Sequence, residues 1–360
     1  MYITLYIIIT FFLSLTLFIK NKSVSNIAIF FILLCIAITL ASRDINTGVD
    51  TISYLEIYNN INPITTYIDT GSFGVLGDKL EYLFSLWISL IKSIGGDFFI
   101  FLFFSYSIML TVLLLAIKKL NVNASIFFIC FFCSYCFIIS YLNVFRQGMA
   151  LSFIFLSFSF YVKDKKMQSI IILFFAGLIH SSAFLFMPFF FISKLLTKKI
   201  NFNITTYFLY MSILLLITLV DKAIPILSIF TSIIPSNTSS RIIFYQATSE
   251  YKAPIYTPSF FLDFIFFLFF TLKVTSRNLY NDYTIKLSII IYYLGLILYI
   301  TISPIGIIAE RLLLLFTIFQ IFVWTKYFTH TDSQRNIKII IMIISCIMFS
   351  LKNIYLTTKI

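Results

Sequence analysis

The sequence contains few charged side chains: only 11% of its 360 residues are Asp, Glu, Lys or Arg, whereas 60% are hydrophobic. A soluble domain carries about 25% charged residues, so this chain has too little polar surface to cover a globule in water. This scarcity excludes an ordinary soluble protein. Instead, apolar runs of about 17–25 residues recur along the chain, each long enough to cross about 30 Å of hydrocarbon as a helix.

The sequence also lacks the short motifs that mark common enzymes. It contains no Walker A sequence, no G-x-G-x-x-G after a strand, no H-E-x-x-H and no G-x-S-x-G. These absences argue against an ATP-driven pump and a zinc membrane protease, and no cofactor is expected. We also find no internal repeat, linker or soluble domain, so residues 1–360 are interpreted as one integral membrane domain.

The net charge of +12 does not indicate nucleic-acid binding. Lysines and arginines lie in short clusters between apolar runs, as they do in the cytoplasmic loops that orient membrane proteins. A nucleic-acid-binding protein needs a basic face with interleaved aromatic residues on a soluble module, which this sequence lacks. The basic residues therefore predict membrane topology.

All five cysteines lie within apolar runs. Cys130, Cys133 and Cys136 form a C-x-x-C-x-x-C pattern that is compatible with a metal or iron–sulfur site. On a helix they form a stripe with phenylalanine neighbours, and this favours buried side chains that act as small hydrophobic groups. We predict no metal site and no redox role.

The apolar runs predict an all-α fold, a polytopic transmembrane helix bundle of about ten full spans. The first run has no basic residue before it and is followed by Lys20 and Lys22, so we expect a retained span and no cleaved signal peptide. Two further stretches, 80–94 and 168–193, are short or interrupted. The predicted full spans lie near 2–19, 24–41, 98–117, 124–142, 147–162, 203–220, 258–275, 287–303, 305–325 and 339–355.

The basic clusters can all be cytoplasmic only if the stretches 80–94 and 168–193 do not span the membrane. The first would be a helix of about 22 Å, which is shorter than the hydrocarbon core. The second is interrupted by His180-Ser181-Ser182, and this favours a re-entrant hairpin. The alternative is one long tilted helix over 168–193, with one lysine cluster that breaks the positive-inside rule.

With the hairpin, both termini and two long loops, 42–79 and 221–257, face outward. Loops of this length are usually functional when they are ordered. Polar residues from distant parts of the sequence then share the outer side, where ionisable groups at membrane depth are candidates for function. These residues are Arg43, Asp44, Asp50, Glu81, Arg146, Gln147, His180, Glu310 and Arg311.

Each candidate also has a structural interpretation. Arg146 and Arg311 are also compatible with interfacial arginines that reach lipid phosphates. His180 is compatible with helix packing, and Asp50 with an ordinary turn. Two arginines, a histidine and carboxylates on one side suit a lipid diphosphate, because guanidinium groups match phosphate geometry with paired hydrogen bonds.

Three short blocks of these residues occur in order along the chain. Arg43 is followed by Gly48-Val49-Asp50-Thr51-x-x-Tyr54, then come Asn143-x-x-Arg146-Gln147-x-x-Ala150 and Ala176-x-x-x-His180-Ser181-Ser182-Ala183. The blocks resemble the R…GxDxxxY, N-x-x-R-Q-x-x-A and A-x-x-x-H-x-S-A patterns of the EpsG/Wzy family of bacterial polysaccharide polymerases. Glu81-Tyr82 and Glu310-Arg311 are similar to further family positions. The resemblance spans about residues 1–325, and neither 221–257 nor the last predicted span matches a known pattern.

The resemblance implies an inner-membrane glycosyltransferase of the inverting type that makes O-antigen, capsule or exopolysaccharide. Such an enzyme joins oligosaccharide repeat units carried on undecaprenyl diphosphate at the periplasmic face. Its donor and acceptor are both lipid-linked glycans in the membrane, and a chain-length regulator is an expected partner.

Residue roles follow from the same resemblance and from side-chain chemistry. Arg146 and Arg311, with Arg43, are expected to bind the diphosphate and stabilise its developing charge, so no metal is required. His180 is the preferred base because an unperturbed imidazole titrates near neutral pH, and Asp50 is the alternative. The side chains expected to recognise sugar are Gln147, Tyr54, Glu81 and Glu310.

Two other functions stay open at this point. A glycolipid flippase would have uninterrupted spans, short loops and charges through both leaflets, and the long loops and one-sided charge argue against it. A related ligase would transfer finished polymer to another acceptor. Only the family blocks favour a polymerase over a ligase.

Overall fold

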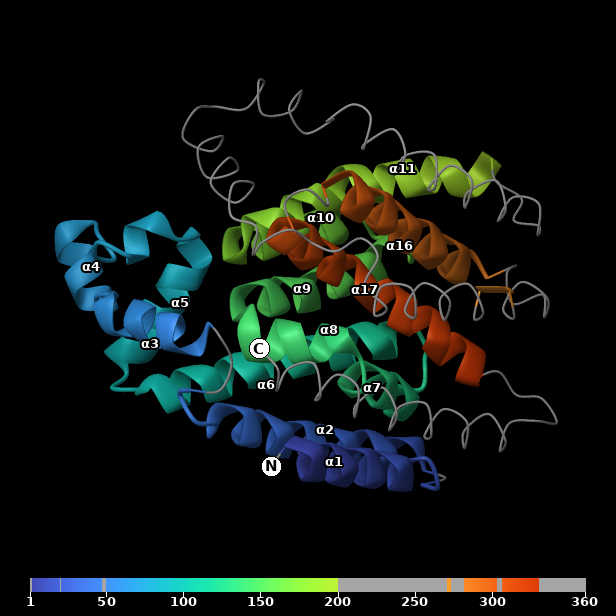
Figure 1. Ribbon diagram of the computed structural model, residues 1–360, viewed down its shortest axis with the longest axis horizontal. Helices are drawn as coiled ribbons and strands as arrows, with labels where there is room; N and C mark the ends of the chain where they lie inside the picture. Colours follow the sequence, from blue (N-terminus) through green and yellow to red (C-terminus); the bar gives the residue numbers. More distant parts are fainter. Residues whose placement is uncertain are drawn as a thin grey trace. The chain divides into compact units, whose positions relative to one another are not determined.

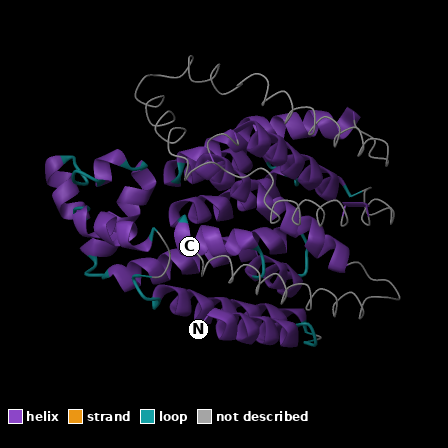
Figure 2. Cartoon of the chain, in the orientation of Figure 1, coloured by secondary structure: helices purple, strands orange, loops and turns teal. Residues whose placement is uncertain are grey.

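A computed structural model describes residues 2–19, 21–46, 50–199, 271–272, 282–302 and 306–329 (Figure 1). Within these ranges every regular element is a helix and no strand occurs, which confirms the all-α class (Figure 2). The chain divides into two compact units, one of Met1–Met187 with Phe328–Ile360 and one of Pro188–Tyr327. That residues 1–360 act as a single membrane domain stays a prediction.

The first unit contains a layered group of long helices. The helix α9 packs between α6 and α10, and α6 also packs against α2 (Figure 1). The packed helices are α1 (Tyr2–Thr16), α2 (Lys22–Ala41), α6 (Phe98–Lys119), α7 (Ala124–Phe132), α9 (Phe145–Tyr161) and α10 (Lys166–Ile179). Between them lie α3 (Thr51–Asn60), α4 (Ile64–Thr70), η1 (Gly77–Lys79), α5 (Tyr82–Ser93), α8 (Tyr135–Ile138), the π-helix η2 (Ile139–Asn143) and η3 (Ser181–Leu185).

The second unit contains α11 (Phe186–Lys199), which begins just before the boundary, α16 (Tyr283–Ile302) and α17 (Gly306–Thr329). The Phe189 ring meets the Phe316 ring edge-to-face with centroids 5.1 Å apart, so α11 packs on α17. Asp282, before α16, forms a 3.1 Å ion pair with Lys326 of α17. The ring contact joins α11 to α17, and the ion pair joins the start of α16 to α17.

Four described helices are long and apolar enough to cross a membrane, namely Ser23–Ala41, Phe98–Lys119, Tyr283–Ile302 and Ile308–Thr329. Ala124–Phe132 and Cys136–Asn143 form a further span if the pair, bent by 76°, is counted as one. The protein is therefore a multi-pass membrane protein. The helices α1 and α9, at two more predicted spans, have 15 and 17 residues, or about 22 and 26 Å. The predicted spans 203–220 and 339–355, most of 258–275 and the loop 221–257 lie outside the described residues.

The stretch 80–94, predicted to be too short for a span, and the stretch 168–193, predicted to be interrupted, both contain short helices. The helix α5 has 12 residues, or about 18 Å. The stretch 168–193 is interrupted at His180, whose φ of −153° and ψ of 118° are extended, and the helices on either side have 14 residues each. The predicted break is confirmed, and the re-entrant hairpin stays a prediction.

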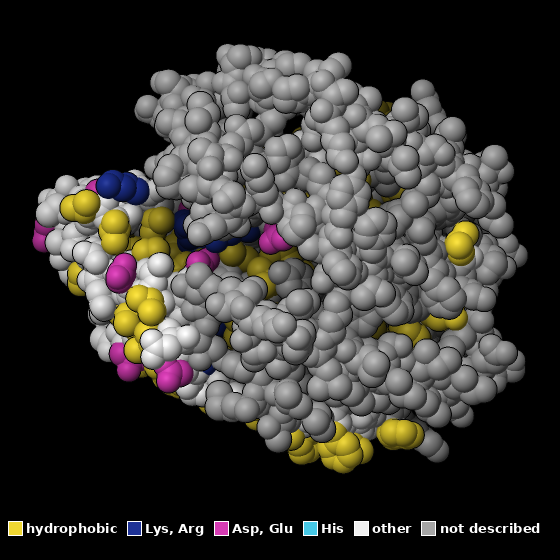
Figure 3. All heavy atoms as spheres, viewed as in Figure 1, with side chains coloured by type: hydrophobic (Ala, Val, Ile, Leu, Met, Phe, Trp, Pro, Cys, Tyr) yellow, Lys and Arg dark blue, Asp and Glu magenta, His cyan; other side chains and the backbone are white. Residues whose placement is uncertain are grey.

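The segment 42–79, predicted as a loop, contains α3, α4 and η1. Pro63 begins α4 because its fixed φ suits a helix start, and Gly71 ends it with a φ of 69° that favours glycine. Lys92 of α5 donates from Nζ to the carbonyl oxygens of Asn59 and Ile61, at 3.0 and 2.7 Å, and so closes the end of α3. Acidic side chains spread over the surface of this region at the left of Figure 3.

An aromatic cluster fixes the start of α9. The Phe145 ring contacts the rings of Tyr54, Phe84, Phe101 and Tyr106 edge-to-face, with centroids 5.2–6.5 Å apart. Each such pair adds about 0.5–1.5 kcal/mol beyond burial of its area. Because the four partners come from α3, α5 and α6, the cluster holds three elements around the first turn of α9.

Gly148 allows α9 to approach the π-helix closely. A Cβ at this position would overlap the carbonyl oxygen of Ser140 and lie 3.0 Å from the Met109 side chain. We therefore expect Gly148→Ala to destabilise the protein by about 1–3 kcal/mol, the usual cost of overpacking. The midpoint of thermal unfolding in detergent measures this, with Met167→Ala at a side chain that is 72% exposed as the control. An unchanged midpoint in Gly148→Ala would contradict the close contact.

Candidate functional site

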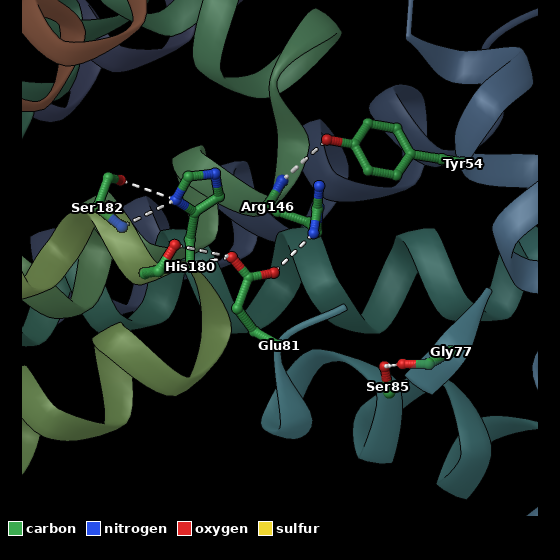
Figure 4. A network of polar contacts seen from close by, with 8 residues as sticks. Tyr54, Gly77, Glu81, Ser85, Arg146, His180 and Ser182 are labelled. Carbon is green, nitrogen blue, oxygen red and sulfur yellow. Dashed lines mark hydrogen bonds and ion pairs between the residues drawn. The ribbon is translucent and has the colours of Figure 1, made fainter. Parts of the chain in front are cut away.

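Arg146 and Glu81 form an ion pair in the first unit. Arg146 is the second residue of α9, and Glu81 directly precedes α5. The Arg146 Nη1 lies 2.7 Å from the Glu81 Oε2, and the side chains are only 24% and 20% exposed (Figure 4). A charge-assisted hydrogen bond of this length in a largely buried place is stronger than a surface ion pair. The Phe84 ring, 5.6 Å from the guanidinium carbon, flanks the pair.

The second oxygen of Glu81 binds the break after α10. Its Oε1 accepts hydrogen bonds from the backbone N–H of Ser181 at 3.1 Å and from the Ser181 hydroxyl at 3.2 Å. Burial alone raises the pKa of Glu81, but the Arg146 charge, hydrogen bonds from backbone N–H groups including that of Ser181, and the nearby His180 together hold this pKa below its usual value. Glu81 is therefore ionised at neutral pH and joins the starts of α5, α9 and η3.

His180 lies beside this carboxylate. Its backbone N–H ends α10 by donating to the Ala176 carbonyl at 2.9 Å, and its side chain caps η3. The Nδ1 accepts from the Ser182 backbone N–H at 3.3 Å and lies 2.7 Å from the Ser182 hydroxyl oxygen. Figure 4 shows the imidazole on the same side of Glu81 as Arg146, and it is close enough for its charge to act on the Glu81 carboxyl. The second and third sequence blocks thus meet at Glu81.

Tyr54 brings the first block to the same place. Its Oη accepts a hydrogen bond of 3.3 Å from the backbone N–H of Arg146 (Figure 4). Asp50 precedes α3, is half-buried, and its carbonyl accepts from the Tyr54 N–H at 3.0 Å. Tyr54 is 7% exposed and Gln147 is 3% exposed. Their expected sugar contacts, like a catalytic role for Asp50, stay predictions.

Arg43 forms a buried junction next to the site. It is 7% exposed, and it donates from Nη1 to the Tyr141 carbonyl at 3.2 Å and from Nη2 to the Thr51 hydroxyl at 2.9 Å. The Tyr106 hydroxyl donates to the same Tyr141 carbonyl at 2.6 Å. Within the described part of the chain no carboxylate pairs with Arg43. These contacts fit a structural role, and the expected diphosphate contact of Arg43 stays a prediction.

The remaining candidates belong to the other unit. Glu310 and Arg311 lie in the first turns of α17, within Pro188–Tyr327. Their roles in sugar and diphosphate binding stay predictions. Among the described residues no group of three or more His, Cys, Asp or Glu side chains is placed to hold a metal ion. Cys130, Cys133 and Cys136 are buried, as expected for small apolar side chains.

The site therefore gathers residues from all three blocks that resemble one family. A family model described as the EpsG family matches residues 26–359. This chain belongs to the EpsG family. No curated protein and no solved structure matches it. The EpsG match extends beyond residue 325, where the resemblance was predicted to end, and includes 221–257 and the last predicted span. Membership identifies the chain broadly as a membrane protein of the polysaccharide polymerase type.

Sequence reasoning placed Glu81 on the outer side but assigned it to sugar and missed its pairing with Arg146. The two residues are 65 positions apart, so no local pattern joins them. Ser181 and Ser182 were interpreted as part of the helix break and of the third family block, without an individual role. The side chain that caps η3 belongs to His180, and histidine is not among the residues typical of helix N-caps, so no common capping pattern pointed to the contact with Nδ1.

The low pKa of Glu81 predicts an acid-dependent loss of stability. A carboxyl whose folded pKa lies below its unfolded value of about 4.3 stabilises the fold fully above that value and loses this contribution as pH falls through the folded pKa. We expect Glu81→Gln to lower the unfolding midpoint at neutral pH and to flatten its decline between about pH 5 and 3. Glu56→Gln, at an exposed carboxylate, is the matched control. Identical pH curves for Glu81→Gln and wild type would exclude a stabilising pair.

Proposed function

We propose that this EpsG family protein is a membrane glycosyltransferase that polymerises oligosaccharide repeat units carried on undecaprenyl diphosphate. We further propose that it works in the bacterial inner membrane with its site facing the periplasm. The basic clusters between spans support this orientation through the positive-inside rule. The family match supports the class of reaction.

The observation that carries the proposal is the arrangement of Arg146. Its Nη1 donates to Glu81, its side chain also lies against the Tyr54 hydroxyl, and its Nε is buried without a partner among the described residues. A guanidinium has five N–H donors, so donors remain for other oxygens. Phosphate oxygens match the fork of a guanidinium, and a guanidinium stays charged throughout the physiological pH range. Arg146 is thus suited to hold the diphosphate next to the lipid-linked sugar.

The reaction follows from this placement. An acceptor sugar hydroxyl attacks the anomeric carbon of the donor, and the bond from that carbon to the phosphate oxygen breaks with inversion. The electron pair leaves with undecaprenyl diphosphate, whose charge Arg146 stabilises in the transition state. Arg311 is proposed as a second guanidinium for the diphosphate. No nucleotide is needed, because the diphosphate ester is already an activated donor.

Donor and acceptor recognition is proposed to involve the polar residues around Arg146. Gln147, Tyr54 and Glu310 are the expected sugar contacts. Glu81, expected to bind sugar as well, is engaged by Arg146 and Ser181 and is suited to orient the guanidinium. A regulator of chain length is a proposed partner, as the resemblance to the polymerase family implies.

Substitution of Arg146 tests this function. In a deletion strain complemented with Arg146→Ala at normal membrane levels, we expect polymer to disappear and single repeat units to remain on surface glycan. Arg146→Lys should leave at least about tenfold less polymer, because an ammonium group cannot form the paired hydrogen bonds. Lys166→Ala removes an exposed cation at the opposite end of α10 from His180 and should leave the polymer unchanged.

Gel analysis of surface glycan distinguishes the outcomes. Long chains in Arg146→Ala would remove this residue from the site. A deletion strain without any surface glycan would indicate a flippase. A deletion strain that accumulates long polymer on its lipid carrier would indicate a ligase. Only single-unit glycan in the deletion strain supports a polymerase.

A further inference from the structure

Three lysines gather at one end of the packed helices α6, α9 and α10. Lys119 is the last residue of α6, and its Nζ lies over the Phe160 ring of α9, 3.7 Å from the ring centroid. Lys163 and Lys165 lie in the turn between α9 and α10, close enough for their charges to act on Lys119. We call Lys119, Lys163 and Lys165 the lysine cluster.

The backbone fixes the position of the cluster. The Lys165 N–H donates to the Phe160 carbonyl at 3.1 Å, and Asp164, between the two lysines of the turn, has a left-handed φ of 56°. This is the Schellman pattern that ends many helices, and α6 ends in the same way with Asn121 at a φ of 54°. Asp and Asn adopt this conformation more readily than other residues with a side chain. The lysines are therefore held on two well-defined helix ends.

Neither helix stability nor membrane orientation explains why the three lysines meet. A lysine in the last turn of α6 suits the helix dipole, but Lys165 stands at the start of α10, where the dipole disfavours a cation. Orientation depends on the number of basic residues in each loop and does not require lysines from two helix ends to meet. Like charges repel, and no carboxylate among the described residues forms an ion pair with any of the three. An anion in contact with the cluster would relieve this repulsion.

Exposed apolar side chains continue from the cluster along both outer helices. On α6, Leu115 is 52% exposed one turn before Lys119. On α10, a stripe of apolar side chains that are 47–51% exposed begins in the second turn and consists of Ile170, Ile171, Phe174 and Phe175. Because α6 is long and apolar enough to span a membrane and Lys119 is its last residue, the cluster lies at the level where hydrocarbon meets lipid headgroups.

We propose that the lysine cluster binds the phosphate of an anionic phospholipid, whose acyl chains lie against Leu115 and the apolar stripe of α10. The headgroup supplies negative charge at the level of the lysines, and ammonium groups bind phosphate as point charges. The acyl chains cover apolar surface that a free phosphate ion or a soluble polyanion would leave exposed. The combination of three cations with an adjoining apolar surface therefore fits an amphiphilic anion.

The lipid site is separate from the site around Arg146. Arg146 is the second residue of α9 and Lys163 follows the end of that helix, so the two residues lie about 25 Å apart along its axis. A diphosphate held by Arg146 therefore does not contact the cluster, and the inference is independent of the proposed polymerase function. A lipid bound to the cluster contacts the ends of α6 and α9 and the start of α10, and we expect it to stabilise their packing.

The stability of the purified full-length protein in detergent tests this site. We expect added phosphatidylglycerol to raise the midpoint of thermal unfolding, because a ligand that binds only the folded state stabilises it, and the rise with lipid concentration gives the affinity. Phosphatidylcholine with the same acyl chains carries no net charge and should raise the midpoint much less. We expect Lys163→Gln to weaken phosphatidylglycerol binding about fivefold, and Lys163→Gln combined with Lys165→Gln about thirtyfold. Both side chains are exposed, so these variants should fold normally.

Lys79→Gln is the matched control, because Lys79 is also exposed but lies in η1, outside the cluster. This variant should bind phosphatidylglycerol as wild type does. Unchanged affinity in the double variant, or an equal loss in Lys79→Gln, would overturn the proposal. So would an equal rise of the midpoint with phosphatidylcholine, which would show that the headgroup charge is not recognised. If inorganic phosphate at the same concentration raises the midpoint as much as phosphatidylglycerol, the cluster binds an anion without a lipid, and the proposal is wrong.

Discussion

The carboxylate of Glu81 is the interaction on which the arrangement of the site depends. It accepts from Arg146 through one oxygen and from Ser181 through the other, so it joins the starts of α5, α9 and η3. Of these elements, α5 and η3 have only 12 and 5 residues, and helices as short as these are positioned by their contacts. Without the carboxylate, Arg146 would be a largely buried charge with no anion among the described residues, which is costly. The Glu81–Arg146 ion pair therefore holds α5, α9 and η3 in position, and their positions in turn keep the two side chains in contact.

Polar chemistry gathers where helices are interrupted. In an apolar environment every backbone group must be satisfied, so a helix break is tolerated only where side chains supply partners. The π-helix leaves the Tyr141 carbonyl available, and both Arg43 and Tyr106 donate to it. At the other break, His180 and Glu81 accept from the N–H groups of Ser182 and Ser181. At each break the backbone loses hydrogen bonds of a regular helix. The polar side chains that replace these bonds include candidate catalytic residues, and the breaks bring them together.

Hydropathy and charge predicted the class of protein, several spans, the short helix at 80–94 and the break at His180, because each depends on local composition. The helices in 42–79 were missed, since α3 and α4 have only ten and seven residues and no long apolar run. The contact of Glu81 with Arg146 was missed because it joins distant segments. The choice of His180 as the base relied on the ordinary pKa of imidazole and stays a prediction.

Charge balance explains why one guanidinium does not complete the proposed site. Arg146 and Glu81 together are neutral, so the pair can stay largely buried while no substrate is bound. A diphosphate brings more negative charge than Arg146 can balance while Glu81 remains beside it. Arg43 is engaged with Tyr141 and Thr51. The proposed reaction therefore needs a second cation to balance the charge of the diphosphate. The sequence predicts Arg311, in the first turns of α17, as a second guanidinium, and that role stays a prediction.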